Sequence, residues 1–268
     1  MNRINILIIG KKSLLAKNYT NHSKIKKITI TDRHNINKLN LKNFSHILNF
    51  SFNPNLKKKK VSFKNQLDNK ISNIIKGKDI IYILPSTRFV YSNLKKPFFK
   101  ESYKIKKIDN IYGFNKRKIE VRLHKILKKK LLILRISTVL LFDTSAKNLF
   151  ISRILRSLKS SNQIFFDIDT NLSKDFITID KFSDALDQLI LKKKTGIFNL
   201  SSGFSIKIKS KLFKILFGFG SGKINHTVVN KSNSYYLDNK KLSKNIKFSI
   251  SKKHILDYCV SLGKKLNA

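Results

Sequence analysis

The stretch INILIIGKKSLLA, residues 4–16, decides the fold of this chain. It opens with a mostly apolar run that ends at Gly10, and Ser13 and Ala16 follow three and six residues later. A buried strand that leads through small residues into a helix is typical of a dinucleotide site, because the backbone must approach the pyrophosphate and the helix must pack close to the strand. Only one of the usual glycines is present, so this signal needs support from the rest of the chain.

A second apolar run, KITIT at 27–31, gives that support because Asp32 follows it directly. An acidic side chain about 20 residues past the glycine turn can accept hydrogen bonds from ribose hydroxyls, which favours NAD over NADP. Lys11, Lys12 and Arg33 lie close enough in sequence to serve a 2′-phosphate instead. A purely structural role for Asp32, as the cap of a turn, stays open at this point.

Further apolar runs continue the pattern of strands. They are HILNF (46–50), DIIYIL (79–84) and LLILRIS (131–137). Continuous apolar runs fit strands of a parallel sheet that is buried on both faces. Helical patterns separate or follow these strands at 61–76, 111–130, 147–160, 180–193, near 205–217 and from about Ser251. The alternation predicts an α/β fold with a doubly wound parallel sheet. GFGSG at 218–222 follows a helical run and is interpreted as a turn, not a phosphate loop.

The composition limits the function classes. A chain of 268 residues with 41% hydrophobic content can bury a sizeable core. The net charge of +42 comes almost wholly from lysine spread along the chain, which favours a solvated basic surface over specific nucleic-acid recognition. A single cysteine and six scattered histidines give no metal-ligand spacing. The short N-terminal apolar run predicts neither a membrane span nor a signal peptide, so we expect a cytoplasmic protein.

The catalytic candidates follow the fourth strand, in LPSTRFVYS (84–92) and IYGFNKRKIEV (111–121). Hydroxyls at the carboxyl end of a central strand lie where ligands bind in open α/β sheets, which singles out Thr87. Tyr112 and Lys116 lie one turn apart on one face of the next predicted helix. A tyrosine is ordinarily protonated at neutral pH, and a neighbouring ammonium favours the phenolate that acts as a base.

The spacing of Tyr112 and Lys116 is not unique in this lysine-rich chain. Tyr91, Tyr103 and Tyr236 also have a lysine four residues later. Each of these three pairs lacks the strand-end hydroxyl upstream, the long helix, or the buried strand downstream. The context therefore favours Tyr112 and Lys116 as the acid/base pair.

With these residues in place, the chain resembles the extended short-chain dehydrogenases/reductases, in the NAD-dependent epimerase/dehydratase group that includes proteins like dTDP-4-dehydrorhamnose reductase. The resemblance spans nearly the whole length. It rests on GKKSLLA, Asp32, STRFVY (86–91), YGFNK (112–116), LRIS (134–137), KDFITIDKFSDAL (174–186), GIFNLSSG (196–203) and LDNKKLSKNIKFS (237–249). It implies a Rossmann domain over 1–163, and over 164–268 a mixed region that completes the sheet and forms a small substrate-binding subdomain.

The resemblance also implies roles for the residues. Tyr112 would be the acid/base, Lys116 would orient the nicotinamide ribose and stabilise the phenolate, and Thr87 would hydrogen-bond the reacting sugar oxygen. The dinucleotide, NAD or NADP, would be bound by Gly10, Ser13, Leu14, Leu15, Ala16, Asp32 and Arg33 together with Tyr112 and Lys116. The segment around 165–180 would help to hold a nucleotide-sugar. The implied reaction is hydride transfer between nicotinamide and sugar, and the implied setting is surface polysaccharide synthesis.

Departures from the family pattern limit the reactions that the resemblance implies for this chain. Arg88 and Phe89 stand where the 4,6-dehydratases carry an Asp-Glu pair and the reductases an Asp-Tyr, so dehydration is disfavoured while epimerase and ketoreductase stay open. A homodimer through the helix at 111–130 is expected by resemblance alone. The alternative hypothesis is a non-catalytic protein of the same fold that binds RNA or serves as a structural subunit, which the altered glycine turn and the charge of +42 favour.

Overall fold

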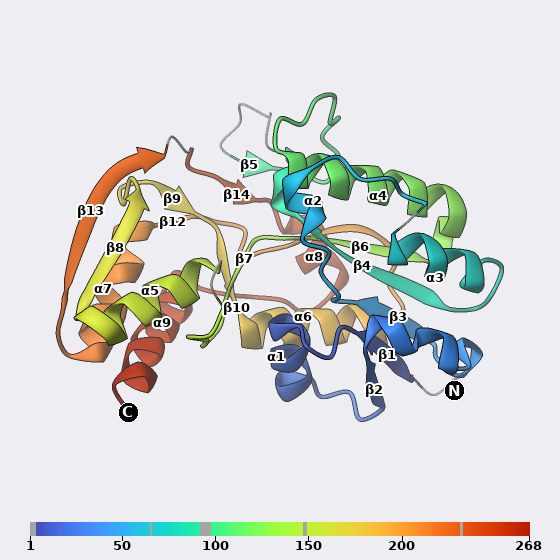
Figure 1. Ribbon diagram of the computed structural model, residues 1–268, viewed down its shortest axis with the longest axis horizontal. Helices are drawn as coiled ribbons and strands as arrows, with labels where there is room; N and C mark the ends of the chain where they lie inside the picture. Colours follow the sequence, from blue (N-terminus) through green and yellow to red (C-terminus); the bar gives the residue numbers. More distant parts are fainter. Residues whose placement is uncertain (1–3, 65, 92–97, 147–148, 231–232) are drawn as a thin grey trace.

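The main sheet of the protein has six parallel strands in the order β11-β6-β4-β3-β1-β2 (Figure 1). This computed structural model describes residues 4–64, 66–91, 98–146, 149–230 and 233–268. The strands of the sheet are β1 (Ile6–Ile9), β2 (Ile28–Thr31), β3 (His46–Asn49), β4 (Ile81–Thr87), β6 (Leu131–Ile136) and β11 (Gly196–Leu200). The predicted doubly wound α/β fold is confirmed.

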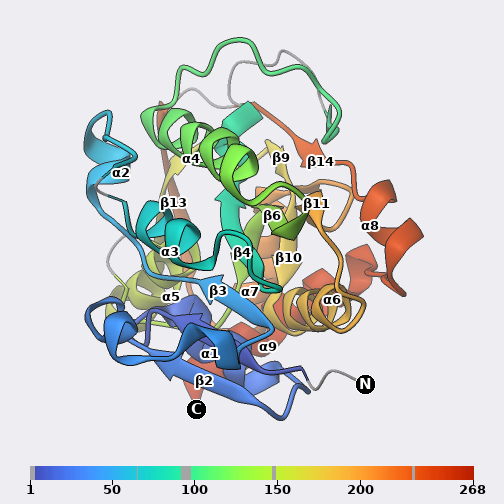
Figure 2. The ribbon, with the colours of Figure 1, turned by 90° about the vertical axis from the view of Figure 1, so that its right-hand side faces the viewer.

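Helices cover both faces of the sheet, as Figure 2 shows. On one face lie α1 (Leu14–His22) and α6 (Ile179–Leu191). On the other lie α3 (Leu67–Ile75) and α4 (Ile111–Leu127). This two-sided cover explains why the inner strands β1 and β6 are almost continuously apolar. The edge strand β2 alternates isoleucine with threonine and is only partly buried.

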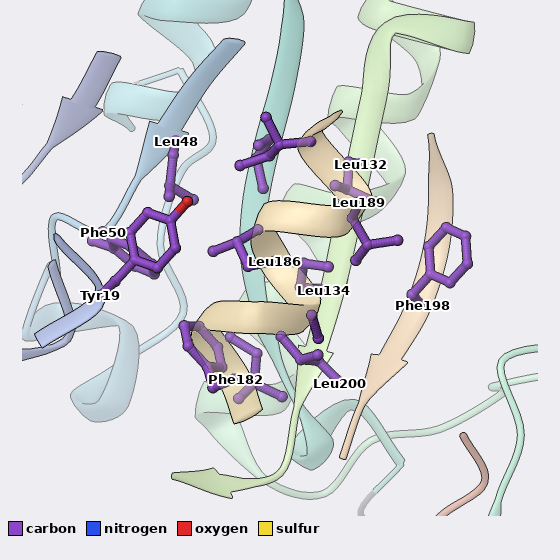
Figure 3. Close-up of a cluster of buried hydrophobic side chains, with 14 of the residues drawn as sticks. Tyr19, Leu48, Phe50, Leu132, Leu134, Phe182, Leu186, Leu189, Phe198 and Leu200 are labelled. Carbon is purple, nitrogen blue, oxygen red and sulfur yellow. The ribbon is translucent and has the colours of Figure 1, made fainter. Parts of the chain in front are cut away.

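The side chains of β1 show how the two cores are divided. Ile6 and Ile8 point into the core under α1 and α6, whereas Leu7 and Ile9 point into the core under α3 and α4. All four are fully buried. Figure 3 shows the first core, in which Phe182 and Leu186 of α6 pack onto side chains of the sheet.

A buried carboxylate ties α1 to α6. Asp187 accepts hydrogen bonds from the Tyr19 hydroxyl at 2.7 Å, from the Ser23 hydroxyl at 2.8 Å and from the Lys24 backbone amide at 2.7 Å. These donors satisfy both of its oxygens, as a buried polar group requires. The first helix of the chain is thereby fixed by a residue far along the sequence.

The second part of the molecule lies beyond one end of the sheet, at the left of Figure 1. Its helices α5 (Phe150–Ser161), α7 (Ile208–Phe219) and α9 (Lys252–Asn267) share a core with the ribbon of β8 (Gln163–Ile168) and β13 (Lys223–Asn230). The chain enters this part after β6, returns to the sheet for α6 and β11, and leaves it again for α7. The two parts are therefore interleaved in sequence.

Short elements complete the fold. Three strand pairs join β5 (Phe98–Phe99) to β14 (Tyr236–Leu237), β7 (Thr138–Leu140) to β10 (Phe176–Thr178), and β9 (Ser173–Lys174) to β12 (Ile206–Lys207). The short helices are α2 (Asn55–Lys58), α8 (Lys240–Asn245), η1 (Arg33–Lys38), η2 (Leu41–Asn43), η3 (Arg88–Tyr91) and η4 (Lys128–Lys130). Within the described ranges, none of the helices has the length and apolar character needed to cross a bilayer.

Candidate active site

Gly10 makes the turn from β1 towards α1 in a conformation that suits glycine. Its φ is +114°, and a Cβ atom at this position would lie 2.8 Å from the Ser51 backbone nitrogen. Ser13 takes the place of the second expected glycine and acts as the N-cap of α1, where its hydroxyl accepts a hydrogen bond from the Ala16 amide at 3.4 Å. The turn has thus kept its geometry although only one glycine remains.

The N-terminus of α1 keeps free donors next to this turn. Within the described ranges, no acceptor is bonded to the backbone amides of Leu14 and Leu15. Unpaired amides at a helix N-terminus, aided by the helix dipole, form a site for phosphate oxygens. Lys11 and Lys12 are exposed on the same turn and add positive charge. These donors fit the pyrophosphate of a dinucleotide.

Asp32 lies beside the glycine turn, because the Gly10 amide donates to the Thr31 carbonyl at 2.8 Å. The Asp32 side chain is partly exposed and makes no capping hydrogen bond to η1. Asp32 occupies the N-cap position of η1 through its backbone, whose carbonyl accepts from the Asn35 amide at 3.1 Å. Its carboxylate takes no part in this cap and is available to ribose hydroxyls. Arg33 is exposed, and its Nε atom lies 3.2 Å from His34 Nε2.

Thr87, Lys116 and Tyr112 gather around the carboxyl end of β4. Thr87 is the last residue of β4, and its hydroxyl oxygen accepts a hydrogen bond from the Phe89 amide at 3.3 Å. Lys116 reaches from α4 to the same strand, where its ammonium donates to the Pro85 carbonyl at 2.8 Å. Both side chains are largely buried.

The Tyr112 ring lies between the segments that follow β3 and β4. It meets the Phe52 ring edge-on at 6.1 Å and the Phe89 ring at 6.3 Å between centroids. Lys57 of α2 holds its ammonium 5.7 Å from the Tyr112 ring centroid. Sequence reasoning missed Lys57, because nothing in its lysine run marks one residue as adjacent to the site.

The long helix α4 is anchored to the sheet by a buried ion pair. Glu120 binds Arg135 of β6 at 2.8 Å, and both side chains are almost completely buried. Burial alone would raise the pKa of the Glu120 carboxyl, but the charge of Arg135 and hydrogen bonds from Arg135, Ser86 and Arg117 lower it. A single charged residue inside the apolar run LLILRIS was the signal that could have revealed this pair.

The ion pair continues into a chain of buried hydrogen bonds. Arg135 donates to the Tyr91 hydroxyl at 2.8 Å, and that hydroxyl donates to the Asn199 side chain of β11 at 2.9 Å. The Asn199 amide group in turn donates to the Phe99 carbonyl at 2.9 Å. This network holds α4, β6 and β11 in one arrangement, so Tyr112 and Lys116 have a fixed position relative to the sheet.

The other tyrosine-lysine pairs differ from Tyr112 and Lys116 in their structural setting. Tyr103 and Lys107 lie outside any helix, and Tyr236 and Lys240 are divided between β14 and α8. Lys95, the partner of Tyr91, lies outside the described residues. In the part of the chain that is described, only Tyr112 and Lys116 occupy successive turns of one helix.

A hollow of about 450 Å³ lies away from this site, near the outer strand β11. Its lining includes Glu101, Asp238 and Lys241. The Glu101 carboxylate accepts a hydrogen bond from the Asn199 backbone amide at 2.8 Å, and burial raises the pKa of the Glu101 carboxyl. Among the described residues, no three His, Cys, Asp or Glu side chains come together as metal ligands would.

Comparisons with solved structures agree with the fold described above. The sequence matches no protein-family model and no curated protein. Among solved structures, UDP-N-acetylglucosamine 4-epimerase from Methanobrevibacter ruminantium M1, in complex with UDP-N-acetylmuramic acid, superposes with a TM-score of 0.81 at 17% identity over 98% of each chain. A dTDP-4-dehydrorhamnose reductase from Clostridium acetobutylicum gives 0.77 at 15% identity over 97% of this chain and 100% of the other.

A third structure, dTDP-glucose 4,6-dehydratase from Bacillus anthracis in complex with NAD, gives a TM-score of 0.78 at 14% identity over 98% of this chain and 97% of the other. At these identities the likeness establishes the fold of the whole chain. The reaction must be argued from the residues of the site.

Proposed function

From the premise that the whole chain has the fold of extended short-chain dehydrogenases/reductases, we propose that it is an NAD(P)-dependent epimerase or ketoreductase acting on a nucleotide-linked sugar. The observation that carries the proposal is the meeting of Thr87, Tyr112 and Lys116 at the carboxyl end of β4, the edge at which α1 begins. Ligands of open α/β sheets bind at this edge.

The cofactor would be held by residues that have unused hydrogen-bonding capacity. The Leu14 and Leu15 amides would bind the pyrophosphate, and the Asp32 carboxylate would accept from ribose hydroxyls, which favours NAD. When bound, the nicotinamide supplies or accepts the hydride. We therefore propose NAD as the cofactor. The alternative is NADP, whose 2′-phosphate Lys11, Lys12 and Arg33 would bind.

The protein groups would move the proton. Tyr112 takes the proton of the sugar hydroxyl as hydride leaves the carbon, or returns it in the reverse direction. The Thr87 oxygen already accepts from the Phe89 amide, so its own hydroxyl proton can be donated to the sugar oxygen. Lys116 uses one ammonium proton on the Pro85 carbonyl and keeps two for the ribose and for electrostatic support of the phenolate.

Dehydration is not proposed. A 4,6-dehydratase needs an acid and a base directly after the threonine to eliminate water, and Arg88 and Phe89 provide neither at neutral pH. The setting in surface polysaccharide synthesis in the cytoplasm belongs to the same proposal, because nucleotide-linked sugars are the activated precursors of such polymers.

The test is titration of the protein with NAD, NADH, NADP and NADPH, followed by turnover with a panel of UDP- and dTDP-sugars. Asp32→Asn should weaken NAD binding roughly tenfold without loss of thermal stability, because the partly exposed carboxylate makes no hydrogen bond to the described part of the chain. Tyr112→Phe should leave NAD affinity unchanged and reduce turnover by about 10²-fold or more. A wild-type protein that binds none of the four nucleotides would exclude the enzyme and favour the non-catalytic hypothesis.

A further inference from the structure

The helix α7 carries large apolar side chains on two of its faces. Its inward face, which includes Ile208, Leu212 and Ile215, packs into the core that α7 shares with α5 and α9. Its outward face holds Phe213 and Phe217, which are 51% and 74% exposed. A surface helix ordinarily buries one apolar stripe and presents polar residues on the opposite side. The outward phenylalanines are therefore more than the core of this part of the molecule requires.

The two exposed phenylalanines form one patch. They are four residues apart on a helix, so their rings lie on the same side of α7, one turn from each other. Among the large hydrophobic residues that the structure describes, Phe217 is the most exposed. Single exposed apolar residues are ordinary on a protein surface, whereas contiguous apolar patches with a polar rim are typical of interaction sites.

Lysines flank this patch on both sides. Because an α-helix has about 3.6 residues per turn, Lys209 lies on one side of the two rings and Lys214 on the other. The Lys209 ammonium lies 5.6 Å from the Phe213 ring centroid, and the Lys214 ammonium lies 5.6 Å from the Phe217 ring centroid. The outward face of α7 thus combines an aromatic centre with a positively charged rim.

The two lysines of this rim have no carboxylate partner within the described ranges. Neither Lys209 nor Lys214 forms an ion pair there, and residues 188–237, which include α7, contain no Asp or Glu. On segments that contact α7, Asp169 and Asp257 form hydrogen bonds within their own segments instead. A partner that matches this face must therefore be both anionic and apolar.

An anionic lipid surface meets both requirements. A helix that lies flat on a bilayer inserts its aromatic rings at the boundary between headgroups and acyl chains, while flanking ammoniums reach the lipid phosphates. Contact with a second copy of the chain would instead bring the lysines of two identical faces together. Single-stranded RNA binds in basic grooves whose aromatic rings stack on bases, whereas these rings stand on the outward surface of a helix.

We infer that the outward face of α7, centred on Phe213 and Phe217, docks the protein onto a membrane surface that contains anionic lipids. The inference goes beyond the proposed function and does not rest on it. The face belongs to the part of the molecule beyond the end of the sheet, whereas the glycine turn that would hold the cofactor belongs to the sheet itself (Figure 1).

The chain contains no tryptophan, so a single introduced tryptophan reports on this face alone. With Phe217→Trp, vesicles of phosphatidylglycerol and phosphatidylcholine should shift the emission to shorter wavelength, and brominated lipids should quench it. Vesicles of phosphatidylcholine alone should cause neither change. The matched control is Leu191→Trp, at the end of α6, where the native side chain is 56% exposed. This variant should show no quenching, because it reports on a different surface.

Vesicle co-sedimentation separates this face from the general attraction of a basic protein to anionic lipid. The double variant Phe213→Gln/Phe217→Gln keeps the net charge of +42. It should bind the anionic vesicles more weakly by about tenfold or more, because the insertion of both rings is lost. Leu191→Gln should bind like wild type, and thermal melts verify the folding of each variant.

Equal vesicle binding by wild type and the double variant would attribute the binding to charge alone and overturn the inference. Equal quenching in Phe217→Trp and Leu191→Trp would do the same. A double variant that keeps vesicle binding but loses affinity for poly(U), or that turns a dimer into a monomer, would assign the face to RNA or to a second copy. Either result also overturns the inference. None of these measurements needs a bound nucleotide, so this inference and the proposed function can fail separately.

Discussion

Lys211 is an ammonium buried in the core between α7 and the strand β10. It is 2% exposed, and it donates to the Ile206 carbonyl at 2.6 Å and to the Lys207 carbonyl at 3.2 Å. Its nitrogen lies 4.2 Å from the Phe176 ring centroid. Burial lowers the pKa of Lys211 to about 7, although electrostatic interactions with Cys259 and Asp175 oppose this shift.

We predict that Lys211 makes stability increase with pH from about 7 towards 10. In that range the unfolded chain holds a proton on Lys211 that the folded chain has lost, so higher pH favours the folded state. Below about 7 both states are protonated, and the full cost of burying the charge remains. Urea denaturation of wild type and Lys211→Met across this range measures the effect as the difference between their pH profiles.

The control for this experiment is Lys118→Met, which removes an exposed lysine of α4 and should follow the wild-type pH profile. Parallel profiles for wild type and Lys211→Met would contradict the prediction, because the remaining pH dependence comes from groups that both proteins share.

At the scale of elements, α7 and α9 touch backbone to backbone through two glycines. A Cβ atom at Gly263 of α9 would lie 2.1 Å from the Ile215 carbonyl oxygen, and one at Gly218 would lie 2.0 Å from the Val260 carbonyl oxygen. Neither residue has a positive φ, so steric space alone requires glycine. The turn expected at 218–222 therefore begins later, since Gly218 and Phe219 belong to α7.

We predict that Gly263→Ala destabilises the protein by roughly 1–3 kcal/mol, because the helices must separate to admit the methyl group. An exposed glycine in a helix would give the opposite sign, since alanine has the higher helix propensity by about 1 kcal/mol. Chemical denaturation gives the value. Ser261→Ala, on the exposed side of α9, should change stability by less than about 0.5 kcal/mol. A stabilised Gly263→Ala variant would contradict the prediction, because it would show that there is room for a methyl group between α7 and α9.

Elements buried on both faces of the sheet were predictable from the sequence. The runs at 4–9, 27–31, 46–50, 79–84 and 131–137 all contain strands of the sheet. For the inner strands the reason is burial on both sides, which demands apolar residues, whereas the edge strand β2 is only partly buried. The ribbon of β8 and β13 was not predicted. Its strands contain polar and charged residues and pair across a long stretch of chain, so no local pattern marks them.

The site was predictable to the same extent. The positions of Gly10, Asp32 and Thr87 at strand ends, and of Tyr112 and Lys116 on one helix, agree with the structure, because local sequence reveals strand ends and helix faces. Their roles in a site stay a prediction. The contacts of Arg88 and of Lys174 with the Tyr235 ring were not predictable. They join residues from distant parts of the chain, and only the folded structure places them around one ring.

At the scale of the whole molecule, the charge of +42 must influence every encounter with a polyanion. We predict that the protein binds heparin or poly(U) at about 50 mM salt and loses roughly 100-fold or more in affinity by about 200 mM, since released counterions drive such binding. NADH should not compete with poly(U), because the lysines are spread over the surface. Fluorescence anisotropy at several salt concentrations tests this. Competition by NADH, or tight binding of one RNA sequence at high salt, would contradict it and favour the non-catalytic hypothesis.

Because Tyr19 of α1 bonds to Asp187 of α6, this contact can form only after most of the chain has been synthesised on the ribosome. The chain grows at about 5–20 residues per second, so α6 emerges on the order of 10–30 s after α1. Throughout that interval the apolar face formed by β1, β3 and β4 has no helix α6 to cover it. The nascent protein is therefore exposed to aggregation for most of its translation, and a chaperone that shields this face until residue 200 has been made would determine how much of it reaches the native state.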